Sequence, residues 1–114
     1  MRDHLLTWQW SLYPDGHTDR RNLLIHIVTV PLFEAGFLTL LFAVFNPWLA
    51  LGGGAAMIAA LVLQGRGHRL EPVRPVPFDG PLDFVTRFFA EQCLTFPRFV
   101  LSGAFAKAWR RAPR

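Results

Sequence analysis

Two long runs of apolar residues dominate the middle of the chain. Leu23 to Phe45 contains one acid, one histidine and no lysine or arginine, and Pro47 to Leu63 contains no charged residue. Each run approaches the roughly 20 residues with which a helix crosses about 30 Å of hydrocarbon. We therefore predict two transmembrane helices, at about residues 22–45 and 47–65.

The residues that join these helices predict an antiparallel hairpin. Asn22 is expected to cap the first helix, and Asn46 followed by Pro47 is typical of one helix ending and another beginning. Pro31 predicts a bend in the first helix, because proline cannot donate a hydrogen bond to the residue four positions back.

The second apolar run is rich in small residues. Gly52, Ala56 and Ala60 recur at a spacing of four, which gives a flat helix surface for close packing, either within the hairpin or in a homo-oligomer. The alternative is a buried hairpin in a soluble protein. A chain of 114 residues, however, has little other surface with which to cover both helices.

Shorter amphipathic segments flank the hairpin. The first is rich in aromatic residues, which prefer the membrane interface. In the second, leucine, valine and phenylalanine share one face, and Asp83, Arg87 and Glu91 form a charge ladder on the opposite face. Pro97 is expected to break or restart this helix. The predicted amphipathic helices cover residues 4–13, 81–96 and 97–111.

The sequence thus predicts one all-α domain, residues 1–114, built as an integral membrane helical hairpin with interfacial amphipathic helices. The formal net charge is +4, and arginines precede and follow the hairpin while its turn has none. By the positive-inside rule, both termini are expected to be cytoplasmic. The basic residues are therefore assigned to lipid head groups, and no nucleic-acid partner is expected.

The histidines suggest a metal site at one edge of the membrane. His26 lies 20 residues before Asn46 and His68 lies 22 after it, so a hairpin brings both to the same level. His17 lies just outside the first helix, and a short turn could fold it inward. Three imidazoles can thus converge, and imidazole binds zinc, iron, copper and nickel.

Other polar residues leave alternatives open. Glu71, three residues after His68, is a carboxylate ligand, an acceptor that orients an imidazole, or a solvated loop charge. His4 is a solvated residue or a fourth ligand. Glu34 is a protonated or paired acid within the hairpin. Four arginines near the helix ends, Arg20, Arg21, Arg66 and Arg69, have the topology and lipid head-group role given above.

Two spaced motifs resemble a known family. The first, Y-x3-H-x4-N-x3-H-x4-P, consists of Tyr13, His17, Asn22, His26 and Pro31. The second, Q-x2-G-H, consists of Gln64, Gly67 and His68, followed by Glu71 and Pro75. Together with the stretch DFVTRFFAEQCLTFPRFVLSG they resemble the small membrane proteins of the Mpo-like 2-hydroxy fatty acid dioxygenase family, from Tyr13 to about Gly103.

The resemblance implies Fe(II)-dependent oxygenation of a 2-hydroxy fatty acid, which shortens it by one carbon in α-oxidation. It implies His17, His26 and His68 as iron ligands, with Tyr13, Asn22 and Glu71 as supporting residues or further ligands. The expected partners are a 2-hydroxy fatty acid, dioxygen and membrane lipid. The implied substrate carboxylate makes Arg20, Arg21, Arg66 and Arg69 candidates for binding it, helped by the positive end of the first long helix. The alternatives are a zinc-dependent or other metal-dependent lipid-modifying enzyme and a non-enzymatic small membrane protein.

Overall fold

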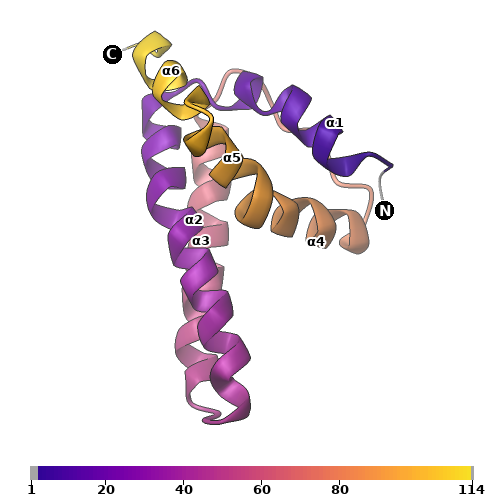
Figure 1. Ribbon diagram of the computed structural model, residues 1–114, viewed down its shortest axis with the longest axis vertical. Coiled ribbons are helices and arrows are strands. Elements are labelled where there is room, and N and C mark those ends of the chain that lie inside the picture. The colour runs from indigo at the N-terminus through magenta and orange to yellow at the C-terminus, as the bar shows by residue number, and fades with distance from the viewer. Residues whose placement is uncertain (1–2, 114) are drawn as a thin grey trace.

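The structure is a computed structural model that describes residues 3–113, and all regular elements in this part of the chain are helical. This confirms the all-α prediction. Figure 1 shows two long helices side by side and several shorter helices gathered around one end of the pair. The elements are α1 (Leu5–Leu12), the 3₁₀ turn η1 (Pro14–Gly16), α2 (Arg20–Leu41), the 3₁₀ turn η2 (Phe42–Val44), α3 (Leu49–Arg69), α4 (Pro81–Ala90), the π-helical turn η3 (Glu91–Thr95), α5 (Phe96–Leu101) and α6 (Ala104–Arg111).

The start of α2 differs from the prediction. Asp19 is the N-cap, and its side chain accepts a hydrogen bond from the backbone N–H of Arg21. Asn22 is instead buried inside the first turn, where its side chain donates to Glu71. Asp19 caps the helix because aspartate is as good a capping residue as asparagine and precedes it in the chain. The second long helix also continues beyond residue 65, so Gln64, Gly67 and His68 all lie within α3.

Glycines allow α2 and α3 to pack closely. A Cβ atom on Gly53 would lie 2.6 Å from the carbonyl oxygen of Gly36, so neither backbone has room for a side chain there. Gly52, which the sequence placed on the packed surface, is exposed and has open space around it. Ala56 and Ala60 do lie on the packed surface: Ala60 is fully buried, and a Cβ atom on Gly36 would lie 2.9 Å from the Cβ of Ala56. At the start of the helix Gly53 takes the place predicted for Gly52, because neighbouring helical residues point about 100° apart.

The charge ladder on α4 faces inward rather than outward. Arg87 and Asp83 form an ion pair of 3.1 Å whose side chains are only 9% and 11% exposed. On the other side of α4, Leu82 and Val85 are exposed. Phe88 and Phe89, which the sequence placed on the same apolar face, instead pack against Phe33 of α2, and Phe96 is buried. The predicted apolar face is therefore only partly exposed, at its N-terminal end.

Of the two outcomes predicted for Pro97, a break or a restart, the structure has a restart: α5 begins at Phe96, so Pro97 lies in its first turn. The π turn η3 ends at Thr95, and this widened turn accommodates a proline that lacks its N–H. The break falls later, at Ser102 and Gly103, where Gly103 has φ of 86°. The turn also adds one residue, so two sequence neighbours, Glu91 and Gln92, both point toward the α2–α3 pair.

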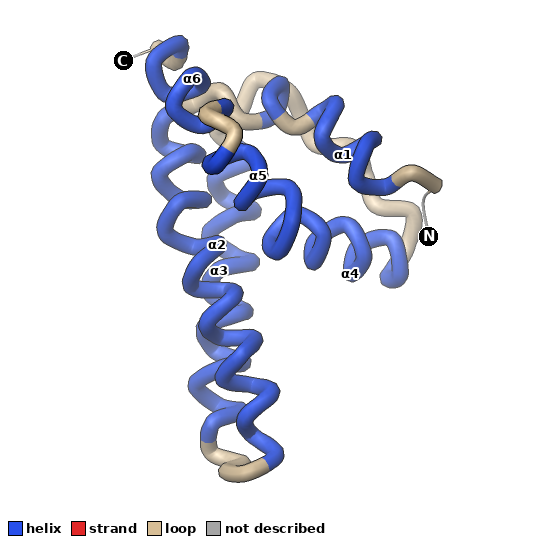
Figure 2. Tube along the Cα trace, in the orientation of Figure 1, coloured by secondary structure: helices blue, strands red, loops and turns tan. Residues whose placement is uncertain are grey.

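The far half of the α2–α3 pair projects away from the other helices (Figures 1 and 2). Arg20–Val44 and Leu49–Arg69 are long and apolar enough to cross a membrane, with mean hydropathies of 2.1 and 1.4 over their most apolar windows. Only 22% and 17% of these windows are buried within the protein. The turn between them carries Phe45 and Trp48, which are 82% and 77% exposed.

Candidate metal centre

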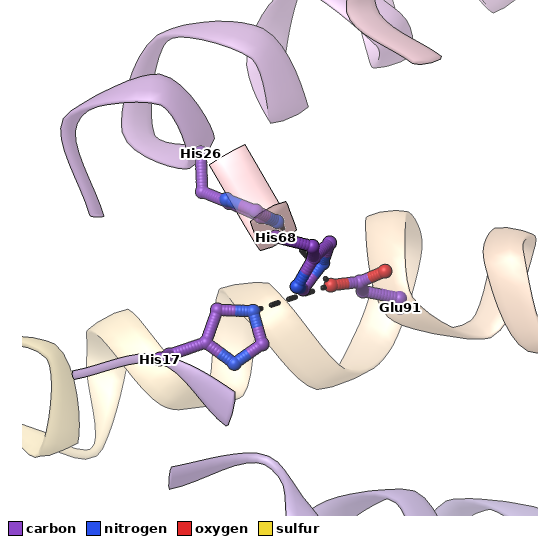
Figure 3. A group of neighbouring side chains, drawn as sticks. All are labelled: His17, His26, His68 and Glu91. Atoms are coloured by element: carbon purple, nitrogen blue, oxygen red, sulfur yellow. Dashed lines mark ion pairs between the residues drawn. The ribbon is translucent and has the colours of Figure 1, made fainter. Parts of the chain in front are cut away.

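Three histidines and one glutamate meet at the end of the α2–α3 pair where the short helices gather. His17 follows η1, His26 lies in α2, His68 lies in the last turn of α3, and Glu91 begins η3. One potential ligand atom from each residue lies within 4.8 Å of those of the other three. Figure 3 shows the four side chains pointing toward one another from separate parts of the chain.

The three imidazole rings form a nearly equilateral group. The centroids of His26 and His68 are 4.9 Å apart, which places them at one level as the hairpin predicts. His17 lies 4.9 Å from His26 and 5.1 Å from His68. The turn at Pro14–Gly16 therefore folds His17 inward, in agreement with the sequence analysis.

Tyr13 holds His17 in two ways. The two rings stack with centroids 3.8 Å apart, and the Nδ1 of His17 lies 2.7 Å from the carbonyl oxygen of Tyr13. A carbonyl can only accept a hydrogen bond, so Nδ1 carries the proton and, in the neutral ring, Nε2 carries a lone pair. The Y-x3-H spacing thus fixes both the position and the tautomer of His17.

A backbone carbonyl orients His26 in the same way, within the same motif. Its Nδ1 lies 3.0 Å from the carbonyl oxygen of Asn22, four residues back along α2. Its ring is fully buried, and its Nε2 has no hydrogen-bond partner among residues 3–113. The Nε2 of His17 is also buried without a partner. Buried polar atoms are almost always hydrogen-bonded, so two such lone pairs directed at one point favour a metal ion.

Glu91 supplies the carboxylate of the group. Its Oε2 accepts a hydrogen bond of 2.8 Å from the Tyr13 hydroxyl and lies 3.7 Å and 3.6 Å from Nε2 of His17 and His26. Burial opposes ionisation of Glu91, but hydrogen bonds and positive charge from His17 and His26, in their protonated forms, outweigh it and hold its pKa well below the usual 4.5. Burial, together with the charge of Glu91, raises the pKa of Tyr13. The carboxylate is therefore ionised while the phenol keeps its proton.

Glu91 was not predicted as a metal ligand, because residues 81–96 were expected to form one regular helix with Glu91 on its polar outer face. The available signal was Pro97, four residues after Cys93 in an otherwise helical pattern. A proline at that place requires a distortion in the preceding turn, and π turns are frequent at functional sites.

Glu71 lies outside the group and supports it. Its carboxylate is 4% exposed and accepts hydrogen bonds from the backbone N–H groups of Thr18 and Asp19, the Thr18 hydroxyl and the Asn22 side chain. These donors lie at the N-terminus of α2, where a negative charge is favourable. Glu71 thus fastens the segment that follows His17 to the end of α3. It is neither solvated nor placed as a ligand.

Gly67 has to be glycine because of Asn22. A Cβ atom at Gly67 would lie 2.2 Å from Oδ1 of Asn22, which is itself buried and has no hydrogen-bond partner. The absence of a side chain lets Asn22 reach Glu71 between the two long helices. In the second motif, Gly67 is therefore needed for helix packing, and the adjacent His68 is a candidate ligand.

The four candidate arginines have different surroundings. Arg20 stacks on the ring of Trp109 and donates to its carbonyl oxygen, and Arg21 pairs with Asp19. Arg69 lines a cavity of about 500 Å³ that also reaches His17, His68 and Glu91, whereas Arg66 does not line it. Arg74, which the sequence analysis did not select for substrate binding, lines the same cavity.

The two remaining titratable candidates lie apart from the group. His4 is exposed beside α1, and Glu34 is half-buried in the middle of α2. Neither belongs to the set of side chains whose ligand atoms converge.

The donor set fits a first-row transition metal. Three imidazoles and a carboxylate suit iron, zinc, nickel and copper. Ligand atoms about 2.0–2.2 Å from one ion are at most about 4.4 Å apart, so the group would contract by a few tenths of an ångström to bind it. Metal ligands in proteins are oriented by hydrogen bonds to their outer atoms. The Nδ1–carbonyl hydrogen bonds of His17 and His26 and the Tyr13–Glu91 hydrogen bond are of this kind.

Comparisons with protein-family models, curated proteins and solved structures give no match.

Proposed function

We propose that this protein is an integral membrane, non-haem iron dioxygenase that acts on 2-hydroxy fatty acids and shortens them by one carbon. His17, His26, His68 and Glu91 would hold the Fe(II). The observation that carries the proposal is the pair of buried, unpartnered Nε2 atoms of His17 and His26, which face Glu91 and one another.

The choice of metal and substrate rests on the resemblance of the two motifs to the 2-hydroxy fatty acid dioxygenase family. Fe(II), once bound, supplies the coordination of dioxygen and of the hydroxy acid that cleavage of the C1–C2 bond requires. The residues around it support this chemistry in three ways: they fix the imidazole tautomers, keep Glu91 ionised and limit access of water.

Water is limited by aromatic side chains. Phe96 lies with its ring centroid 5.8 Å from that of His26, and Phe99 lies 5.9 Å from that of His17; both phenylalanines are buried. The cavity on the other side reaches His17, His68 and Glu91. A substrate entering from the cavity can thus meet the metal, while the opposite side of the group is packed.

Membrane insertion is the second part of the proposal. Apolar side chains on the projecting half of α2 and α3 are exposed, among them Leu38, Leu41 and Ile58. Arg20 and Arg21 begin α2 and Arg66 and Arg69 end α3, whereas the turn at residues 42–48 has no charge. This arrangement favours a transmembrane hairpin with the metal centre at the cytoplasmic interface and both termini on that side. The helices α1, α4 and α6 would lie along this interface.

The activity is tested by oxygen uptake of protein purified without air and loaded with Fe(II). We expect uptake with a 2-hydroxy fatty acid, no uptake with the unhydroxylated acid of the same length, and a product one carbon shorter. The same donor set also suits zinc, which makes a zinc-dependent lipid-modifying enzyme the second candidate. Tight binding of zinc without iron, and no oxygen uptake after iron loading, would favour that candidate and overturn the dioxygenase proposal.

A further inference from the structure

The cavity beside the metal centre has the shape and chemistry of a binding site for one lipid chain. It lies between α1, α3, α4 and the loop that follows α3, and its volume is about 500 Å³. This is within the usual range of roughly 300–1,000 Å³ for small-molecule sites. A lipid with two acyl chains exceeds it.

One wall of the cavity is a row of aromatic rings. The ring centroids of Phe78 and Phe84 are 4.9 Å apart, and those of Phe84 and Phe88 are 5.6 Å apart in a stacked arrangement. These rings extend from the loop along α4 toward Glu91. An unbranched apolar chain that starts at the metal centre can lie against them.

Arg87 fixes this wall in place. Its guanidinium donates to the carbonyl oxygens of Val76 and Pro77 and lies over the rings of Trp8 and Phe78, at 5.0 and 4.2 Å from their centroids. Arg87 therefore joins the loop, α1 and α4. Because its donors are engaged in this way, it is not available for a substrate carboxylate.

Two other arginines are available. Arg69 and Arg74 line the cavity, and neither has a hydrogen bond or ion pair with any residue that the structure describes. Arg69 directly follows His68, so its side chain starts beside the metal centre. An acidic head group at these two guanidinium groups would place the adjoining carbon atoms next to the candidate ligands.

We propose that this cavity binds a single-chain fatty acid, with its carboxylate at Arg69 and Arg74 and its chain between α1 and α4 rather than in the surrounding lipid. The proposal rests on the proposed function for the identity of the reaction, but the binding itself does not require the metal. Gly65 is a position from which a larger side chain can be introduced into the cavity. It lines the cavity in α3 one turn before His68, and a Cβ atom there meets nothing within 4 Å.

The test is binding of palmitate to Gly65→Phe and Gly65→Leu variants, measured by displacement of a fluorescent fatty acid from the detergent-solubilised protein. Both side chains fill the cavity, so we expect at least a tenfold loss of affinity, with unchanged helix content and metal content. The matched control is Gly52→Phe, in the same helix and also with open space around it, which should bind palmitate as the wild type does.

The head group is tested with charge variants and with other lipids. Arg69→Gln combined with Arg74→Gln should weaken palmitate binding about tenfold, whereas Arg66→Gln should not. Hexadecanol should compete poorly, and phosphatidic acid with two chains should not compete. Wild-type affinity in both folded Gly65 variants, or equal competition by phosphatidic acid, would overturn the cavity proposal. Palmitate binding that is lost in the Gly65 variants of a protein that binds no metal would overturn the proposed function alone.

Discussion

Tyr13 connects most of the features of the metal centre through one side chain. Its ring stacks on His17, its carbonyl accepts from Nδ1 of that histidine, and its hydroxyl donates to Glu91. Two of the four candidate ligands thus depend on it. The hydroxyl can be removed while the ring and the backbone are kept, which separates orientation of Glu91 from packing around His17.

Tyr13→Phe is expected to lower metal affinity about 10- to 100-fold, because the Glu91 carboxylate loses the hydrogen bond that orients it. The fold should persist, since the stacked ring remains. Competition with a metal-binding indicator dye measures the affinity, and Tyr13→Ala serves as the comparison in which the ring is lost as well. Unchanged affinity in Tyr13→Phe would contradict the supporting role of the hydroxyl.

Glu71→Gln tests the support of the segment around His17. Glutamine keeps the size of the side chain but presents an N–H₂ group to donors from Asp19 or Asn22. We expect a loss of about 1–3 kcal/mol in the free energy of unfolding, measured by chemical denaturation in micelles. Glu34→Gln, which removes a carboxylate in the middle of α2, is the matched control. Equal stability of the two variants would show that the buried hydrogen bonds of Glu71 contribute little.

At the scale of single residues, the sequence predicts the histidines but not their carboxylate. His26 and His68 follow from counting helical rise on either side of the turn at Asn46, and His17 follows from the short turn that precedes the first long helix. Glu71 was a natural candidate because it lies close to His68 in sequence, yet its carboxylate turns to backbone donors that no spacing reveals. Glu91 lies far along the chain and reaches the group only because α4 turns its polar side inward.

At the scale of elements, the π turn η3 decides which residues of the C-terminal helices face the long pair. It places Glu91 at the metal centre and Gln92 against α3. The side-chain amides of Gln92 and Gln64 exchange two hydrogen bonds of 2.8 and 2.9 Å, and both residues are buried. This reciprocal pair joins η3 to α3 one turn before His68, so it fixes Glu91 relative to the histidines.

A double-mutant cycle tests the glutamine pair. Gln64→Leu and Gln92→Leu each leave the other amide buried without its partner, which costs about 1–3 kcal/mol of stability. The double variant replaces both amides by apolar groups and should lose less than the sum of the two single losses. The free energy of unfolding in micelles gives the four values of the cycle. Additive losses would mean that the two amides do not act as a pair.

The long helices were predicted well because hydropathy over about 20 residues is a strong signal. The shorter elements were predicted less accurately for identifiable reasons. On the packed face of α3, Ala56 and Ala60 were predicted correctly and Gly52 was not, since glycines occupy three neighbouring positions, Gly52 to Gly54, and spacing cannot choose among them. A π turn has no characteristic composition, so Pro97 predicts a break or restart of the helix but not the widened turn that precedes it.

At the scale of the whole molecule, the candidate metal ligands and the exposed apolar half of the α2–α3 pair lie at opposite ends. The candidate ligands, the cavity and most arginines lie where the short helices gather, whereas the projecting half of α2 and α3 exposes mainly apolar side chains (Figure 1). The proposed orientation follows from this separation: the projecting half lies in lipid and the metal centre lies at its edge. A substrate with an acidic head and an apolar chain matches such a boundary.

The central claim is that the four convergent side chains bind one metal ion, and metal content measures it most directly. Elemental analysis of anaerobically purified protein should give about one iron per chain for the wild type and for His4→Ala, whose histidine is exposed and outside the group. His26→Ala and Glu91→Ala, checked for helix content, should each lose most of that iron. Equal metal content in all four proteins, or none in the wild type after loading with Fe(II), would contradict the account.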